Sequence, residues 1–299
     1  KRRLFSTLLC VAALTAGLFV SGCGSDKAGG IGSVVSSVVD GGSDEKAAAK
    51  LNTLIDATNR FNGDNATWGQ NYADSLAKLK GGFQEGAIGR QPHYDTLKEA
   101  LEQSKKEGST FKEVDTERDN VLNVLNELVP TFKDLKAYDD SKAYMNDGGA
   151  KGKELAAKYV AQVEKFDAAY AKFNDALNKA NTEQTKKQIE KLKKDGKKGY
   201  AAAMESTLRL TTLVENVEKS PKNADKQAVE KELNEIQTLL KSINNDRGEV
   251  LVNSYNSVVG SVRQVLNDAN ENNLNDMIEN FNNYIESYNN TTPDQFDSK

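Results

Sequence analysis

The chain repeats apolar residues at the spacing of an α-helix along most of its length. The clearest run lies between residues 150 and 180, where intervals of three and four residues separate Leu155, Tyr159, Val163, Phe166, Tyr170, Phe173 and Leu177. Such intervals place these side chains on one face of a single helix. The opposite face is made of Lys, Glu, Asp and Asn. We therefore interpret the aromatic stripe as core, and not as the lining of a cofactor site.

Similar stripes predict the other helices of the chain. With only four prolines and almost no alternating runs of β-branched residues, we predict an all-α fold, an elongated bundle of about seven to nine helices. Glycines at positions 63 and 81–82 are expected to end the first two helices. The expected helices span residues 43–62, 68–80, 94–106, 111–135, 150–180, 200–214, 224–244, 250–268 and 274–289.

Two residues interrupt the apolar stripe of the predicted helix at 111–135. Arg118 falls in phase with the apolar positions, although it carries a charge. Pro130 lies inside the same stretch, and a proline within a helix removes a hydrogen bond. We expect Pro130 to bend this helix or to split it.

The first 23 residues follow a different pattern. Lys1-Arg2-Arg3 precede an apolar run over residues 4–20, and the run closes with Val20-Ser21-Gly22-Cys23. This is the layout of a secretory signal, and the run is short for a membrane-spanning helix. A cysteine directly after small residues is typical of bacterial lipoproteins, so we expect residues 1–22 to be a lipoprotein signal peptide. Cys23 would then be the lipidated first residue of the mature chain, carrying fatty acids such as palmitate; an ordinary signal peptide beside a free cysteine is the alternative.

Residues 23–43 are expected to form the lipidated cysteine and a flexible tether, because Gly, Ser and Asp dominate after Cys23. The helical domain then covers residues 44–299, with a sub-boundary expected near 137–150, where Tyr, Lys, Asp and Gly gather. We expect a lipid-anchored protein of the cell envelope. Gly24 follows the cysteine where an Asp would favour the inner membrane, so an outer membrane facing the periplasm is expected in a Gram-negative organism.

The cysteine content and the net charge indicate which compartment and which partners suit the chain. Cys10 lies in the leader, so acylation of Cys23 would leave the mature chain without a free thiol or a disulfide, as suits an oxidising compartment. Loss of the three basic leader residues takes the formal charge from −4 to −7. An acidic chain as a whole gains nothing from long-range attraction to nucleic acid or to anionic lipid headgroups, and we expect no nucleic-acid partner.

A lysine-rich stretch at 186–198 is the exception to this acidic composition. It could be a basic patch for a polyanion, such as lipopolysaccharide phosphate or nucleic acid. However, acidic residues are interleaved with the lysines, and aromatic residues for stacking on bases are absent from the run. We favour a solvated helix face.

Candidate chemistry is sparse. His93 is the only histidine, which excludes a two-histidine zinc motif and a di-iron site with paired Glu-x-x-His. A Ser-His-Asp triad would have to use His93. Asp139-Asp140 and Asp147 offer oxygen ligands for a cation, although a solvated turn suits them better. We expect no enzyme, no cofactor and no metal, and we name Tyr144, Asp147 and Lys153 as candidate ligand-binding residues.

Several landmarks give the chain a resemblance to a known family. They are Val20-Ser21-Gly22-Cys23, Asn59-Arg60-Phe61-Asn62, the stretch 147–155 that leads into the long aromatic helix, and the stretch 281–289. On these the chain resembles the YiiG-like family of bacterial lipoproteins, a domain of unknown function. A related sequence carries His where this chain has Ala156, so no role of that histidine transfers. The resemblance implies an extended helical lipoprotein without an established activity.

Three hypotheses of function follow. In the first, the chain is a non-enzymatic lipoprotein anchored to the bilayer through Cys23, and its helical bundle presents a surface to an envelope protein. In the second, it is a periplasmic lipoprotein that binds a small ligand or a metal near residues 138–153. The third, a hydrolase that uses His93, is the least favoured.

Overall fold

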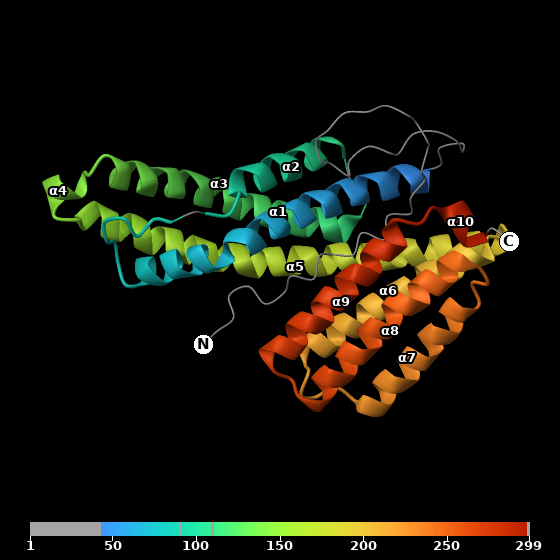
Figure 1. The fold of residues 1–299 in the computed structure, drawn as a ribbon. Coiled ribbons are helices and arrows are strands. Elements are labelled where there is room, and N and C mark those ends of the chain that lie inside the picture. The colour runs from blue at the N-terminus through green and yellow to red at the C-terminus, as the bar shows by residue number, and fades with distance from the viewer. Residues whose placement is uncertain (1–42, 90, 109–110, 298–299) are drawn as a thin grey trace, which may run out of the picture. The chain divides into compact units, whose positions relative to one another are not determined.

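The computed structural model describes residues 43–297, except 90 and 109–110, and leaves out the side chains of 43–46 and 64–70. All regular structure among these residues is helical, and none of them lies in a strand. The all-α prediction is confirmed (Figure 1). The predicted signal peptide, Cys23 and the predicted tether lie outside the described residues.

The described chain divides into two compact units. The first contains residues up to Ala180 and the second begins at Asn181, so the division falls within a single helix, α5 (Ala150–Lys194). The stretch 137–150, where a sub-boundary was expected, lies inside the first unit. None of the described helices is both long enough and apolar enough to cross a membrane.

The first unit is built from α1 (Ser43–Lys80), α2 (Tyr94–Lys106), α3 (Lys112–Asp140), the single turn α4 (Tyr144–Asp147) and the first part of α5. One hydrophobic cluster joins these helices. The aromatic stripe of α5 enters this cluster, as the sequence predicted. Its central members, each at most 2% exposed, are Tyr159, Val163, Phe166, Phe173 and Leu177.

The helix break expected at Gly63 is wrong, and of the two alternatives for Pro130 the split does not occur. Gly63 does not end the first helix, which continues to Lys80. A glycine inside a helix costs only about 1 kcal/mol, and α1 buries Phe61 and Tyr72 on either side of it in the same core. Pro130 does not split α3, because the residues on both sides of it, Val129 and Thr131, are buried.

Arg118 is buried within α3 and paired with acids of the same helix. Its guanidinium donates to Asp115 at 2.7 Å and to Asp119 at 3.1 Å. Only 6% of its side chain is exposed. The charged position on the apolar stripe is therefore explained by two local carboxylates.

In the described part of the chain, the second unit contains the end of α5 and the helices α6 (Lys198–Lys219), α7 (Lys226–Lys241), α8 (Asp246–Asn267), α9 (Glu271–Asn289) and α10 (Pro293–Asp297). Figure 1 shows α8 and α9 side by side, with α6 and α7 completing the bundle. Asp225, Asn245 and Asn270 each cap the helix that follows by accepting backbone N–H bonds. The core of this unit includes the fully buried Met204, Tyr255, Val258, Met277 and Tyr284.

The short helix α10 closes one end of this bundle. The Phe296 ring stacks with Tyr200 at 5.8 Å and with Tyr288 at 6.0 Å between ring centroids. The Asp297 carboxylate accepts a 2.7 Å hydrogen bond from the Gly199 N–H at the start of α6. The Asn245 amide donates to the carbonyl oxygens of Gln295 and Phe296, both at 3.1 Å. These contacts tie the N-termini of α6 and α8 to the same segment.

Candidate functional site

The connection between α3 and α5 is organised by Asp147. Its Oδ1 accepts hydrogen bonds from the Tyr138 hydroxyl at 2.6 Å and the Gly149 N–H at 2.9 Å. Its Oδ2 accepts from the Lys151 N–H at 3.1 Å. The carboxylate thus satisfies free N–H groups at the start of α5, where the helix dipole also favours a negative charge.

These bonds change the ionisation of Asp147. The hydroxyl of Tyr138 is the largest cause that lowers the pKa of Asp147 from its usual value, and the backbone N–H groups act in the same direction, against the opposing effect of burial. Hydrogen bonds to the charged form of a carboxyl always act in this direction. Both carboxylate oxygens of Asp147 already accept hydrogen bonds from the protein, which is unfavourable for a role as a cation ligand.

A glycine lets two rings approach the first turn of α5. A Cβ at Gly152 would fall 2.5 Å from the Phe83 ring and 2.6 Å from the Tyr138 ring. The two rings meet edge to face, with centroids 5.2 Å apart. The position beside Lys153 therefore has to be glycine, because any side chain would push Phe83 and Tyr138 away.

Tyr144 and Lys153 lie in different surroundings from Asp147. The Tyr144 ring packs against Phe83, with centroids 5.8 Å apart. The nearby Glu85 carboxylate, followed by burial, raises the pKa of Tyr144 to about 12, although no described residue forms a hydrogen bond of normal geometry with this hydroxyl. Lys153 is exposed on α5. The three candidate residues thus share one connection, but their polar groups are not seen to converge on one point.

Lys153 lines a cavity of about 310 Å³ between the end of α1 and α5. The apolar residues that line the cavity are Leu79, Ala157, Val160 and Ala161. Its charged rim contains Lys80 and Glu164, which form a 3.0 Å ion pair. A small molecule with an apolar body and an anionic group would match this lining.

Two other acidic residues near the same connection, Asp139 and Asp140, also have partners close by. Asp140 forms an ion pair with Lys136 at 2.9 Å, and Asp139 accepts a long 3.5 Å hydrogen bond from the Gly86 N–H. Across the described residues, His, Cys, Asp and Glu nowhere gather in a group of three or more that could hold a metal ion. His93 is exposed at the start of α2, where its side chain does not cap the helix.

A buried group of tyrosine hydroxyls is the feature that the sequence analysis missed. Tyr72 and Tyr94 share a 2.9 Å hydrogen bond between their hydroxyls. The Tyr159 hydroxyl donates to the side-chain carbonyl of Gln91. Burial is the main cause that raises the pKa of all three phenols, so they stay neutral donors. The sequence held part of this signal, since Tyr159 lies in the aromatic stripe and a buried hydroxyl needs a hydrogen-bond partner.

The loop between α1 and α2 contacts one of these tyrosines, Tyr159, and is fixed by Ser75. The Ser75 hydroxyl donates to the Ala87 carbonyl at 2.7 Å and accepts from the Gly89 N–H at 2.9 Å. Gln91 then meets Tyr159. The glycine-rich loop, which sequence alone would leave without structure, is therefore held at two points.

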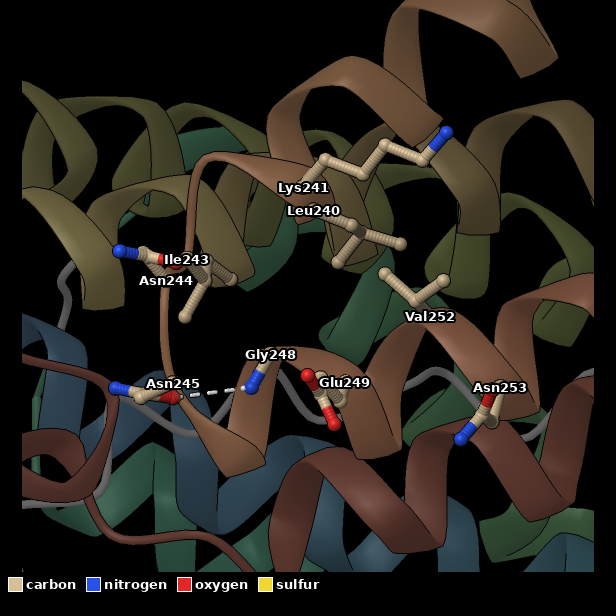
Figure 2. A pocket seen from close by; sticks show the side chains of 9 residues that line it. All are labelled: Leu240, Lys241, Ile243, Asn244, Asn245, Gly248, Glu249, Val252 and Asn253. Carbon is tan, nitrogen blue, oxygen red and sulfur yellow. Dashed lines mark hydrogen bonds between the residues drawn. The ribbon is translucent and has the colours of Figure 1, made fainter.

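The second unit has a cavity of about 280 Å³ at the turn between α7 and α8. Figure 2 shows Leu240 and Val252 facing each other across it, with Glu249 on the α8 side. Asn245 caps α8 at its edge by accepting the Gly248 N–H at 3.1 Å. A Cβ at Gly248 would fall 2.1 Å from the Ile243 carbonyl oxygen, so this glycine permits the tight turn beside the cavity.

Comparison with protein families assigns the chain to one family. A family described as protein of unknown function (DUF3829) matches residues 45–279. The chain belongs to this family. The DUF3829 match begins in α1 and ends in α9, so it covers helices of both units, the tyrosine hydroxyls and the Asp147 cap. No curated protein and no solved structure matches the chain. Membership of the DUF3829 family supports the resemblance to a domain of unknown function and supplies no activity.

Proposed function

We propose that this DUF3829 protein is a lipoprotein of the bacterial cell envelope, anchored through Cys23, whose helical part binds an envelope protein. The observation that carries the anchor is the order of residues at the start of the chain: three basic residues, an apolar run, and Val20-Ser21-Gly22-Cys23. This order is that of a secretory signal followed by a cysteine. Two or more acyl chains on that cysteine would hold the chain stably at a bilayer.

The distance between the anchor and the fold suits this arrangement. The first described helix begins at Ser43, and the residues between Cys23 and Ser43 are rich in Gly and Ser. A coil of that length and composition spans roughly 25 Å. The resemblance to the YiiG-like lipoproteins points the same way, and Gly24 favours the periplasmic face of the outer membrane in a Gram-negative organism.

A protein-binding role is supported by the tip of the hairpin between α3 and α5. Met145 is 73% exposed on α4, while Asp147 and the Phe83–Tyr144 contact hold the backbone around it. Flexible methionine side chains are favoured at the centre of protein interfaces. The carboxylate of Asp147, two residues from Met145, is already engaged in structural hydrogen bonds, and the role that we propose is non-enzymatic.

Palmitate labelling tests the anchor. Cells that produce the chain should incorporate radiolabelled palmitate into it, and a Cys23→Ser variant should not. The mature chain should start at Cys23 with an acyl mass attached. A purified native protein that keeps its leader, or that starts elsewhere without an acyl group, would refute the proposal.

Site-specific crosslinking tests the partner. A photoreactive amino acid in place of Met145 should give a discrete crosslinked product in intact cells, whereas the same group at the exposed Lys231 on α7 should not give that product. Absence of a specific product at Met145 would count against the hairpin tip as the contact surface.

A second candidate function is binding of a small ligand or metal in the periplasm. The cavity beside Lys153, with Lys80 and Glu164 on its rim, favours a small anionic ligand over a metal. Native mass spectrometry and thermal shift against metals and envelope metabolites separate the two functions. A ligand-dependent shift that a Lys153→Gln variant loses would favour this second function.

A further inference from the structure

The end of α5 carries lysines on the face that points away from the core. Lys187, Lys191 and Lys194 follow one another at intervals of four and three residues, which places them on one helix face. All three are exposed, whereas Thr185 and Ile189 of the same turns are buried.

Most acidic residues around this stretch form ion pairs with its other lysines. Lys193 pairs with Glu190 at 3.2 Å and with Glu205 at 2.9 Å. Lys197 pairs with Asp294 at 2.7 Å. In contrast, Lys187, Lys191 and Lys194 form no ion pair with any residue that the structure describes. The positive charge of this face is therefore not compensated locally.

We propose that this lysine face, formed by Lys187, Lys191 and Lys194 and flanked by Lys186 and Lys198, binds the anionic phospholipid headgroups of a bilayer. These five lysines are exposed and form no ion pair with the described residues. The same stretch contains only two exposed acidic residues that also lack an ion pair, Glu183 and Asp195. The whole chain carries a net charge of −4. An anionic surface would attract this face, whereas the rest of the chain carries a negative net charge, and this difference would orient the domain.

The chemistry of the side chains favours a lipid surface over other polyanions. Lysine is a flexible point charge that suits a diffuse array of headgroups, while the bidentate capture of a single phosphate favours arginine. Single-stranded nucleic acid would need aromatic platforms for its bases, and residues 186–198 contain none. Each lysine close to an anionic leaflet adds to the attraction.

This inference rests on the proposed function in one respect. A lipid anchor keeps the domain near a bilayer, and one acyl signal combined with a basic patch is an established route to stable attachment. The competing explanation is that these lysines only stabilise the C-terminal end of α5 through the helix dipole. That explanation predicts no binding to lipid.

Vesicle sedimentation distinguishes the two. The probe is a vesicle of phosphatidylcholine, either alone or mixed with phosphatidylglycerol, and the protein is residues 24–299, which contain every described helix. We expect binding at least about tenfold tighter to the mixed vesicles at low salt, and loss of that preference at about 1 M salt, where the Debye length is about 3 Å. The variant Lys187→Gln/Lys191→Gln/Lys194→Gln should lose at least about tenfold of this affinity.

A matched control removes the same charge elsewhere. Lys98→Gln/Lys136→Gln/Lys151→Gln takes away three lysines that each pair with an acid of their own helix, and it should keep the preference for mixed vesicles. Equal loss in both variants, unchanged binding in the first, or no preference for phosphatidylglycerol would each overturn the proposal. Because this protein lacks Cys23, the result does not depend on acylation, which the palmitate experiment tests by itself.

Discussion

Gly199 and Phe296 approach so closely that a Cβ on Gly199 would lie 2.0 Å from the Phe296 carbonyl oxygen. The same turn of α6 donates the Gly199 N–H to Asp297 at 2.7 Å. Phe296 is 2% exposed beneath it. Glycine at position 199 thus allows α10 to pack against the start of α6. This end of the second unit depends on a contact between residues that are far apart in sequence.

A Gly199→Ala substitution should therefore destabilise the protein. Alanine is normally the better helix residue, but here its methyl group has to displace α10 or shift the start of α6. Overpacking of this kind costs about 1–3 kcal/mol. Urea denaturation measures the free energy of unfolding, and hydrogen exchange should show weaker protection at the first turn of α6.

Gly260 supplies the matched control. It lies inside α8, and a Cβ there would meet nothing within 4 Å. Gly260→Ala should stabilise the protein by about 0.5–1 kcal/mol. If both substitutions stabilised the protein, the close contact between Gly199 and Phe296 would not exist in solution.

Removing one hydroxyl from the tyrosine pair should cost stability. Tyr94→Phe removes the 2.9 Å hydrogen bond between the two buried hydroxyls, and a lost hydrogen bond of this type costs about 1–3 kcal/mol. The double variant Tyr72→Phe/Tyr94→Phe should cost less than the sum of the two single variants, because each single variant already removes the same shared hydrogen bond. Additive single effects, measured by urea denaturation, would argue against a direct bond.

Replacement of Arg118 tests the buried ion pairs of α3. Arg118→Met keeps much of the side-chain volume but leaves Asp115 without its guanidinium partner, and the Asp115 side chain is only 16% exposed. We expect a loss of about 1.5–3 kcal/mol, the range for hydrogen bonds to charged groups. Lys136→Met, which removes an exposed pair with Asp140, should change stability by less than about 1 kcal/mol.

Periodicity predicted most of the fold because each helix presents a continuous apolar face. The expected helix at 94–106 coincides with α2, and the last three expected helices match α7, α8 and α9 within a few residues. The break expected at Gly63 was wrong, and a split at Pro130 does not occur, for a shared reason. Local propensity opposes the helix at these two residues, but burial of the neighbouring side chains outweighs it.

The candidate site was less accessible to sequence reasoning. The connection before α5 was correctly singled out, since Asp147 and its glycines lie beside a helix start. Its main partner, however, is the Tyr138 hydroxyl, and the contact with Phe83 needs the fold. The pairing of Tyr159 with Gln91 joins positions that no helical period relates. Such contacts depend on which helices pack together, which a single sequence does not state.

The Asp147 cap gives a pH dependence with a defined sign. Its pKa is lowered in the folded chain, chiefly by the Tyr138 hydroxyl, so the stabilisation is fully present above the unfolded value of about 3.9 and is lost as the pH falls through the lowered folded value. Asp147→Asn should lower the melting temperature at neutral pH and reduce this acid-dependent loss. Tyr138→Phe should raise the pKa of Asp147 back toward its ordinary value, which NMR titration of the carboxyl measures. An Asp147 pKa that does not respond to Tyr138→Phe would show that the hydroxyl does not bond to the carboxylate in solution.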